Sequence, residues 1–154
     1  MRVEDALRGV TRLGIDTSPF IYFIEANPNY FERTSEVFQR MSKGAFTGIT
    51  SVITLTEALH KPLKQGDKLV EQAYRRMVRR SRQLTLVSVS LEIAEQAAHL
   101  RAGHNLRTPD ALQIATALDQ RCEAFLTNDF GLKRITQVRI IVLDELELQP
   151  SSDI

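Results

Sequence analysis

Short apolar runs alternate with longer amphipathic stretches along this chain, and that alternation is the strongest constraint on its fold. Five short runs predict strands, at residues 13–15, 45–49, 84–89, 124–126 and 138–143. Seven stretches with apolar residues at the helical period predict helices, at residues 19–24, 30–41, 51–59, 67–82, 90–100, 108–118 and 129–135. Strands joined through helices need crossover connections, which favour a mostly parallel sheet covered on both faces.

The expected helix ends follow from capping residues and prolines. Ser18 is expected to cap the helix that Pro19 opens, and Pro62 is expected to close the helix over residues 51–59. On the helix over residues 67–82, we expect Leu69, Tyr74 and other apolar side chains to lie on one side and the arginines on the other.

The size and composition of the chain indicate one globular domain. Its 154 residues are 43% hydrophobic and 25% charged, which excludes a wholly disordered chain. No apolar run approaches the roughly 18 residues of a membrane span, and the first residues do not resemble a secretion signal. Cys122 is the single cysteine, which excludes an internal disulfide and a multi-cysteine zinc site. A cytoplasmic protein without a membrane partner is therefore expected.

Four acidic residues stand where such a fold gathers its ligand-binding groups. Asp16 follows the first predicted strand directly, and Asp129 follows the fourth. Glu57 lies in the helix after the second strand, and Asp110 lies in the first turn of the helix over residues 108–118. In parallel α/β sheets, ligands bind beyond the carboxyl ends of the strands. We therefore expect these four carboxylates to converge at one edge of the sheet.

Converging carboxylates need a counter-charge. Two like charges about 4 Å apart repel by roughly 4 kcal/mol at an effective dielectric constant near 20, so protons or cations must neutralise the cluster. Ligation by oxygen alone favours Mg²⁺ or Mn²⁺ over zinc. Such an ion can deprotonate water and hold a phosphodiester for in-line attack. The four acids therefore predict a metal-dependent site whose substrate carries phosphate.

Each acid also has a purely structural interpretation. Asp129 could cap the helix that follows it, Asp110 could lie favourably at a helix dipole, and Glu57 could lie on a solvated helix face. Asp16 is harder to explain in this way, because Ser18 already provides a cap. Most neighbours of Glu57 are apolar, and a buried glutamate without a partner would be costly.

At these residues the chain resembles the PIN-domain nucleases, in particular the VapC-like ribonuclease toxins of type II toxin–antitoxin systems. The matching segments, in the family's order, are residues 15–18, 56–58, 107–117 and 126–130. The resemblance covers residues 13–146 and implies a three-layer α/β/α fold with a mostly parallel five-stranded sheet. Residues 1–12 would then be an N-terminal extension, and residues 147–154 a C-terminal tail that we expect to be flexible.

The resemblance implies an Mg²⁺- or Mn²⁺-dependent ribonuclease, one or two ions, a cognate antitoxin and a homodimer. Asp16 and Asp110 would be the main metal ligands, Asp129 would complete a metal shell, and Glu57 would bind metal or position the attacking water. Beside these acids, hydroxyl and amide groups could orient a carboxylate or a water molecule. They belong to Thr17, Ser18, Thr127 and Asn128.

A basic segment supplies a candidate RNA contact. Residues 64–82 contain seven basic and two acidic side chains, although the net charge of the chain is only +1. Arg75, Arg76, Arg79 and Arg80 could form a phosphate track toward the acids, or simply a solvated helix face.

Two other functions remain open from the sequence, and a third is disfavoured. A stand-alone PIN nuclease in RNA processing and a non-catalytic RNA-binding module are both compatible with the same residues. A haloacid-dehalogenase-like phosphatase would need a second acid two residues after Asp16, where Ser18 stands, so the sequence disfavours it. His60, His99 and His104 do not form a ligand pattern, and we expect structural or exposed roles for them.

Overall fold

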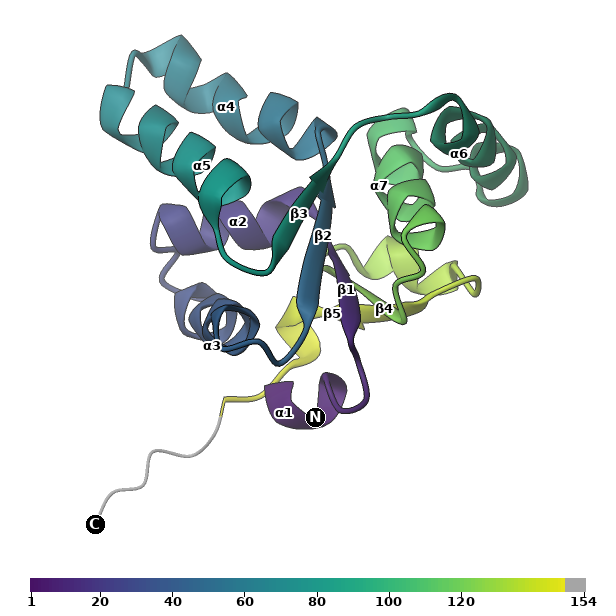
Figure 1. The fold of residues 1–154 in the computed structure, drawn as a ribbon, viewed down its shortest axis with the longest axis horizontal. Helices are drawn as coiled ribbons and strands as arrows, with labels where there is room; N and C mark the ends of the chain where they lie inside the picture. The colour runs from purple at the N-terminus through teal and green to yellow at the C-terminus, as the bar shows by residue number, and fades with distance from the viewer. Residues whose placement is uncertain (149–154) are drawn as a thin grey trace.

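The centre of the molecule is a five-stranded parallel sheet (Figure 1), seen in a computed structural model that describes residues 1–148. The strands are β1 (Arg12–Ile15), β2 (Thr47–Ser51), β3 (Leu84–Val87), β4 (Ala124–Thr127) and β5 (Arg139–Val142). Their order is β3-β2-β1-β4-β5. The direction of strand addition therefore reverses at β1, which pairs with β2 on one side and β4 on the other. A crevice for ligands is expected where the carboxyl ends of β1 and β4 meet.

Helices cover both faces of the sheet and complete three layers, as predicted (Figure 1). One face carries α2 (Thr17–Ile24), α3 (Phe31–Ser42) and α5 (Lys68–Arg80), and α4 (Ile53–Gln65) forms an antiparallel hairpin with α5. The other face carries α6 (Leu91–His104) and α7 (Thr108–Asp119). The short helix α1 (Val3–Ala6) precedes β1, and two 3₁₀ helices flank β5 at Phe130–Arg134 and Leu143–Glu145.

The core is divided in two by the sheet, because successive side chains of a strand point to opposite faces. Leu13 and Ile15 of β1 are fully buried in the cluster under α2, α3 and α5. Gly14 lies between them and faces α7, where an added Cβ would stand only 2.8 Å from the Cβ of Ala117. Glycine at this position lets α7, and the acid it carries, pack directly against β1.

Both ends of the described chain pack onto this frame. Val3 and Ala6 of α1 are buried in the core, within the segment expected to be an N-terminal extension. The amide of Glu147 donates a 2.8 Å hydrogen bond to the carbonyl of Met1, which joins the start of the predicted tail to the N-terminus. The rest of that tail, residues 149–154, lies outside the described residues.

Local predictions were wrong at several helix and strand ends. Asp16, rather than Ser18, is the N-cap of α2. Pro62 is buried inside α4, which continues past the proline to Gln65 and ends at a left-handed Gly66 (φ 69°). On α5, Leu69 is 80% exposed, whereas Glu71 is buried.

The second strand also begins later than predicted, at Thr47 instead of residue 45, because the turn after α3 takes residues 43–46. No helix among residues 1–148 is both long enough and apolar enough to cross a membrane.

Candidate active site

A polar cleft of about 400 Å³ lies at the carboxyl edge of the sheet, where β1 and β4 end. All four predicted acids line it: Asp16 after β1, Asp129 after β4, Glu57 from α4 and Asp110 from α7. Its other lining residues are Thr17, Ser18, Ile21, Tyr22, Arg107, Thr127 and Asn128. The chain thus brings together acids that lie as far apart in the sequence as Asp16 and Asp129.

Asp16 is the most constrained of the acids. Its Oδ1 accepts a 2.8 Å hydrogen bond from the amide of Thr17, and its Oδ2 accepts one of 2.8 Å from the hydroxyl of Thr127. Burial nevertheless raises the pKa of Asp16 to about 6, because the two hydrogen bonds only partly offset the loss of water. The neighbouring charges of Asp110 and Glu57 raise this pKa further.

Glu57 is exposed at the rim of the cleft, which agrees with the solvated-face interpretation and not with burial among its apolar neighbours. The side chain of Glu57 projects from α4 toward the first turn of α2, where its Oε1 accepts a 2.7 Å hydrogen bond from the hydroxyl of Thr17. Thr17 in turn accepts a hydrogen bond of 3.2 Å from Nε2 of the buried Gln113 on α7. Glu57 is therefore held by a buried polar network and is not merely a solvated side chain.

Asp110 is paired with a cation in the same cleft. Nε of Arg107 lies 3.0 Å from Oδ2 of Asp110, and Nη2 lies 3.4 Å from Oδ1. This hydrogen-bonded ion pair raises the pKa of Arg107, and the charges of Glu57 and Asp129 raise it further. Arg107 is the one basic side chain among the described residues that line the cleft.

Asp129 is exposed and also acts as a helix cap. Its Oδ1 accepts a 2.8 Å hydrogen bond from the amide of Gly131, which opens the 3₁₀ helix after β4. This capping is the structural role anticipated from the sequence, and it leaves Oδ2 of the carboxylate without a hydrogen-bond partner among residues 1–148.

The polar neighbours of the acids have different contacts. Thr17 and Thr127 each donate a hydrogen bond to a carboxylate of the cleft, whereas Asn128 contacts other residues. Oδ1 of Asn128 accepts a 2.9 Å hydrogen bond from the amide of Asp144, and its Nδ2 donates one of 3.3 Å to the hydroxyl of Tyr22. Ser18 lines the cleft from the first turn of α2.

The donor set fits a hard divalent ion, because four carboxylates and several hydroxyls supply only oxygen. Within residues 1–148, no three His, Cys, Asp or Glu side chains are already grouped around one ion position. Each acid instead accepts a hydrogen bond from the protein, and Asp110 uses both of its oxygens on Arg107. An ion that took Asp110 as a ligand would have to replace this contact.

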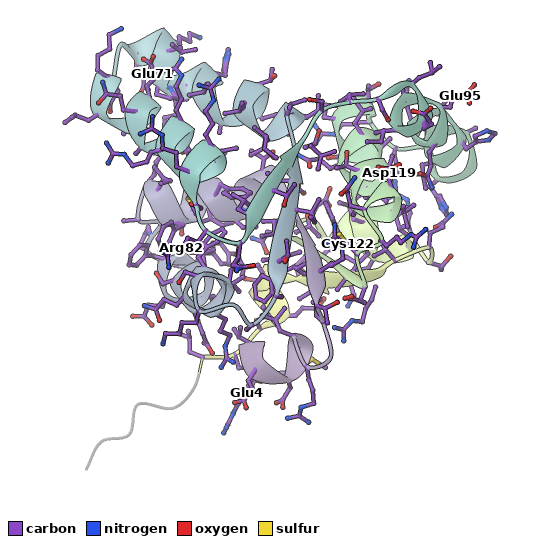
Figure 2. All side chains as sticks on the ribbon, viewed as in Figure 1. Glu4, Glu71, Arg82, Glu95, Asp119 and Cys122 are labelled. Carbon is purple, nitrogen blue, oxygen red and sulfur yellow. The ribbon has the colours of Figure 1, made fainter. Side chains whose placement is uncertain are left out.

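The predicted arginines lie on α5, outside this cleft. Arg75, Arg76, Arg79 and Arg80 line a separate groove of about 250 Å³ with Gln72. Arg75 pairs with Glu71 one turn earlier, near the outer end of the α4–α5 hairpin (Figure 2), and this hydrogen bond lowers the pKa of Glu71. The remaining three arginines have no hydrogen-bond or ion-pair partner among the described residues.

A larger, mainly apolar groove of about 780 Å³ lies between α2, α3 and α5. Phe23, Phe31, Phe38, Met41 and Met77 line it, and Phe31 is 39% exposed. Arg82, which Figure 2 shows beside α3, and Glu36 add charge at its border. This groove lacks the carboxylate cluster and belongs to a different face from the acidic cleft.

The sequence analysis assigned no role to Arg107 or Gln113, although both belong to the matching segment at residues 107–117. A signal was present for Gln113, because a polar side chain stands there among apolar neighbours of the helix. For Arg107 the signal was its position three residues before Asp110, a spacing that lets the two side chains meet on one helix face.

Comparisons with known proteins agree with this geometry. A family model of the PIN domain matches residues 14–138. The fold is similar to that of VapBC2 from Rickettsia felis bound to a promoter DNA fragment, with a TM-score of 0.67, 19% identity and coverage of 86% of this chain and 98% of that chain. A toxin–antitoxin complex from Klebsiella pneumoniae has a TM-score of 0.66 and 22% identity, over 86% of this chain and 98% of that chain.

The sarcin–ricin-loop-cleaving toxin VapC20 from Mycobacterium tuberculosis has a TM-score of 0.65 and 17% identity, over 84% of this chain and 99% of that chain. A search of the curated proteins by sequence gives no significant match.

Proposed function

Because this chain belongs to the PIN domain family, we propose that it is a divalent-metal-dependent ribonuclease that hydrolyses phosphodiester bonds in RNA. One observation carries the proposal: four carboxylates from four separate segments line one cleft at the switch point of the sheet. The pKa of Asp16, raised to about 6 mainly by burial and further by the charges of Asp110 and Glu57, supports it, because strongly shifted pKa values gather at functional sites. An RNA phosphate bridged by a cation is the substrate group that such a cleft suits.

Mg²⁺ or Mn²⁺ would be held mainly by Asp16 and Asp110, with Asp129 and Glu57 completing the ligands. When bound, the ion would lower the pKa of a water molecule and neutralise charge on the phosphate. The protein's own contribution is to fix the ligands. Thr127 holds Asp16 at 2.8 Å, and Thr17 holds Glu57 at 2.7 Å, so neither carboxylate has to be ordered when substrate arrives.

The arginines of α5 are proposed to bind RNA phosphates away from the cleft. Arg76, Arg79 and Arg80 are exposed and lie along a groove in which a nucleic-acid backbone can approach several guanidinium groups. Contacts of this kind give affinity without sequence recognition. They would therefore raise the affinity for RNA and leave the choice of cleavage site to the cleft.

We also propose that the chain acts as a toxin with a cognate antitoxin. VapBC2 and the Klebsiella pneumoniae complex, which share this fold, are toxin–antitoxin assemblies. The groove between α2, α3 and α5 offers the apolar surface that a partner protein needs, including the exposed ring of Phe31. A homodimer, which the family resemblance implies, stays a prediction that sedimentation of the purified chain would test.

The first experiment tests the reaction. Purified protein is incubated with total RNA in Mg²⁺, in Mn²⁺ and in EDTA, beside the Asp16→Asn variant. Cleavage that requires the ion and is lost in the variant supports the proposal, whereas full activity in EDTA contradicts the metal role. RNA that is bound by wild type but never cleaved would favour the non-catalytic binding module.

A second experiment separates a toxin from a stand-alone nuclease. The chain is induced in a bacterial host, and growth is followed for wild type and for Asp16→Asn. Growth arrest that depends on Asp16 supports a toxin. Normal growth, together with RNA cleavage in vitro, would support a nuclease of RNA processing instead.

A further inference from the structure

Arg107 occupies an unusual position for a basic residue, because it lies among the acids that are proposed to bind a cation. It is the N-cap residue of α7, yet its side chain does not cap the helix. The guanidinium instead reaches Asp110 in the first turn and contacts both carboxylate oxygens, at 3.0 and 3.4 Å. Both oxygens of Asp110 are therefore occupied by Arg107, and Asp110 would have to give up this contact to bind a metal ion.

The two members of this pair differ sharply in exposure. The side chain of Asp110 is only 13% exposed, whereas that of Arg107 is 76% exposed. The carboxylate is therefore fixed in the wall of the cleft, while the arginine covers it from the solvent side. The guanidinium can leave without disturbing the core, because the only side-chain hydrogen bonds of Arg107 to the described residues are those to Asp110.

The charge balance changes when a divalent ion enters. Without the ion, Arg107 is attracted by Asp110 and by the charges of Glu57 and Asp129. An ion on Asp110 would neutralise this attraction and repel the guanidinium at close range. A guanidinium displaced in this way would remain at the mouth of the cleft, at the N-terminus of a helix, where peptide dipoles also favour an anion.

From these observations we propose that Arg107 is a phosphate-binding residue of the cleft, and that in the ion-free protein it holds Asp110 in place of the metal. This inference rests on the proposed ribonuclease function. With Asp110 engaged by an ion, the guanidinium of Arg107 would be free, and its planar N–H groups would hydrogen-bond to oxygens of the RNA phosphodiester. The arginine and the ion thus compete for Asp110 but cooperate on the substrate.

The test uses Arg107→Gln and two measurements. The first is Mn²⁺ affinity of the RNA-free protein by calorimetry, which should increase about fivefold or more in the variant because the competing cation is gone. The second is kcat/KM for RNA cleavage at saturating Mn²⁺, which should fall at least about tenfold because a charged hydrogen bond to phosphate is lost. Tighter metal binding with slower cleavage is the signature of this dual role.

Arg8→Gln is the matched control. Arg8, which follows α1, pairs with Asp5 of that helix at the same three-residue spacing, at 2.9 Å and with a 73% exposed side chain. It should change neither measurement. Unchanged Mn²⁺ affinity in Arg107→Gln would overturn the exchange at Asp110, and tighter metal binding with undiminished cleavage would overturn the phosphate contact.

The two proposals can fail separately. If wild type does not cleave RNA under any ion condition, the ribonuclease function fails and the phosphate contact fails with it. The Mn²⁺ titrations of Arg107→Gln would still support or overturn the exchange at Asp110, because they contain no RNA.

Discussion

The hydroxyl of Thr17 donates a 2.7 Å hydrogen bond to Oε1 of Glu57 and so joins the first turn of α2 to α4 across the base of the cleft. Nε2 of Gln113 donates to Thr17 at 3.2 Å and to Thr54 at 2.9 Å. Because Thr50 donates to the carbonyl of Ile15, Thr54 must be the donor in its 2.6 Å contact with Thr50. The hydroxyl of Thr17 lies 2.7 Å from Glu57 and 3.4 Å from the hydroxyl of Thr54, so its proton is directed to the closer and charged acceptor, Glu57.

Thr17→Val tests this positioning, because valine keeps the shape of threonine and removes the hydroxyl. We expect kcat for RNA cleavage to fall about tenfold, with little change in KM, since Glu57 loses its orientation and the RNA-binding surface is intact. Stability should fall by about 1 kcal/mol, because Gln113 loses one acceptor. Steady-state kinetics and urea unfolding measure the two effects.

Thr17→Ser retains the hydroxyl and should restore most of the activity. If valine and serine reduce kcat equally, the hydroxyl does not position Glu57 and only the packing of Thr17 matters.

Asp16→Asn should abolish cleavage and still stabilise the ion-free protein. A pKa raised from 3.8 to about 6 means that the ionised carboxylate costs up to about 3 kcal/mol in the folded state above pH 6. Removing that charge should raise the melting temperature in EDTA by several degrees, at about 2–4 °C per kcal/mol for a chain of this size.

Asp119→Asn, at the far end of α7, is the control and should alter neither activity nor melting temperature. A variant that melts below wild type would show that the hydrogen bonds of Asp16 outweigh its charge.

The pH dependence of stability isolates the same carboxyl group. Asp16 has a folded pKa of about 6, above its unfolded value of 3.8, so the folded state binds more protons between these pH values. The free energy of unfolding of the ion-free protein should therefore increase as the pH falls from 7 toward 5. Glu71 and Glu123, whose pKa values are lowered, contribute stability that is lost only at lower pH, below this window. Urea unfolding in EDTA measures the free energy of unfolding of wild type and of Asp16→Asn. The difference between these two free energies should become smaller as the pH falls. A difference that is independent of pH would contradict the raised pKa.

The architecture was predictable because buried residues are apolar and recur at regular spacings in strands and helices. Leu13 and Ile15 point to one face of the sheet, and Ile114 and Ala115 of α7 lie in the core on the other side. Such apolar patterns predicted the parallel sheet and its two helical layers, and the family model agrees with this fold. Strand order then determines which residues share an edge, so Asp16 and Asp129 could be assigned to one region from their positions alone.

The contacts within the site were not predictable in the same way. Which of Asp16 and Ser18 caps α2 depends on where the backbone leaves β1, and both residues are good caps. The pairing of Arg107 with Asp110 depends on side-chain rotamers, and a long exposed arginine has many. Pro62 was misassigned because a proline normally ends a helix, whereas here tertiary packing keeps it inside α4.

Charge reversal on α5 tests the proposed RNA track. The Arg76→Glu, Arg80→Glu double variant should weaken RNA binding and reduce the slope of log affinity against log salt by at least about 1.4, since each phosphate contact on single strands contributes about 0.7. Fluorescence anisotropy over a series of salt concentrations measures this slope in EDTA, where cleavage is absent.

The control is the Lys43→Glu, Arg121→Glu double variant. It makes the same change in charge at exposed residues outside the α5 groove and the acidic cleft, and should leave the slope near that of wild type. Equal slopes for both double variants would count against the track.

Gly14→Ala should damage both stability and catalysis, although Gly14 does not line the acidic cleft. An alanine Cβ there would lie 2.8 Å from the Cβ of Ala117 and 2.9 Å from the ring of Phe125, so β1 and α7 must separate. Overpacking of this kind costs about 1–3 kcal/mol, and thermal unfolding should detect it as a lower melting temperature. Because β1 leads into Asp16 and α7 carries Asp110, the same separation should also lower kcat/KM.

Gly103→Ala is the control: its Cβ would meet nothing within 4 Å on the exposed side of α6, and alanine there should stabilise the helix by up to about 1 kcal/mol. If both alanines raise the melting temperature, the close approach of β1 to α7 does not limit the packing around Asp16 and Asp110.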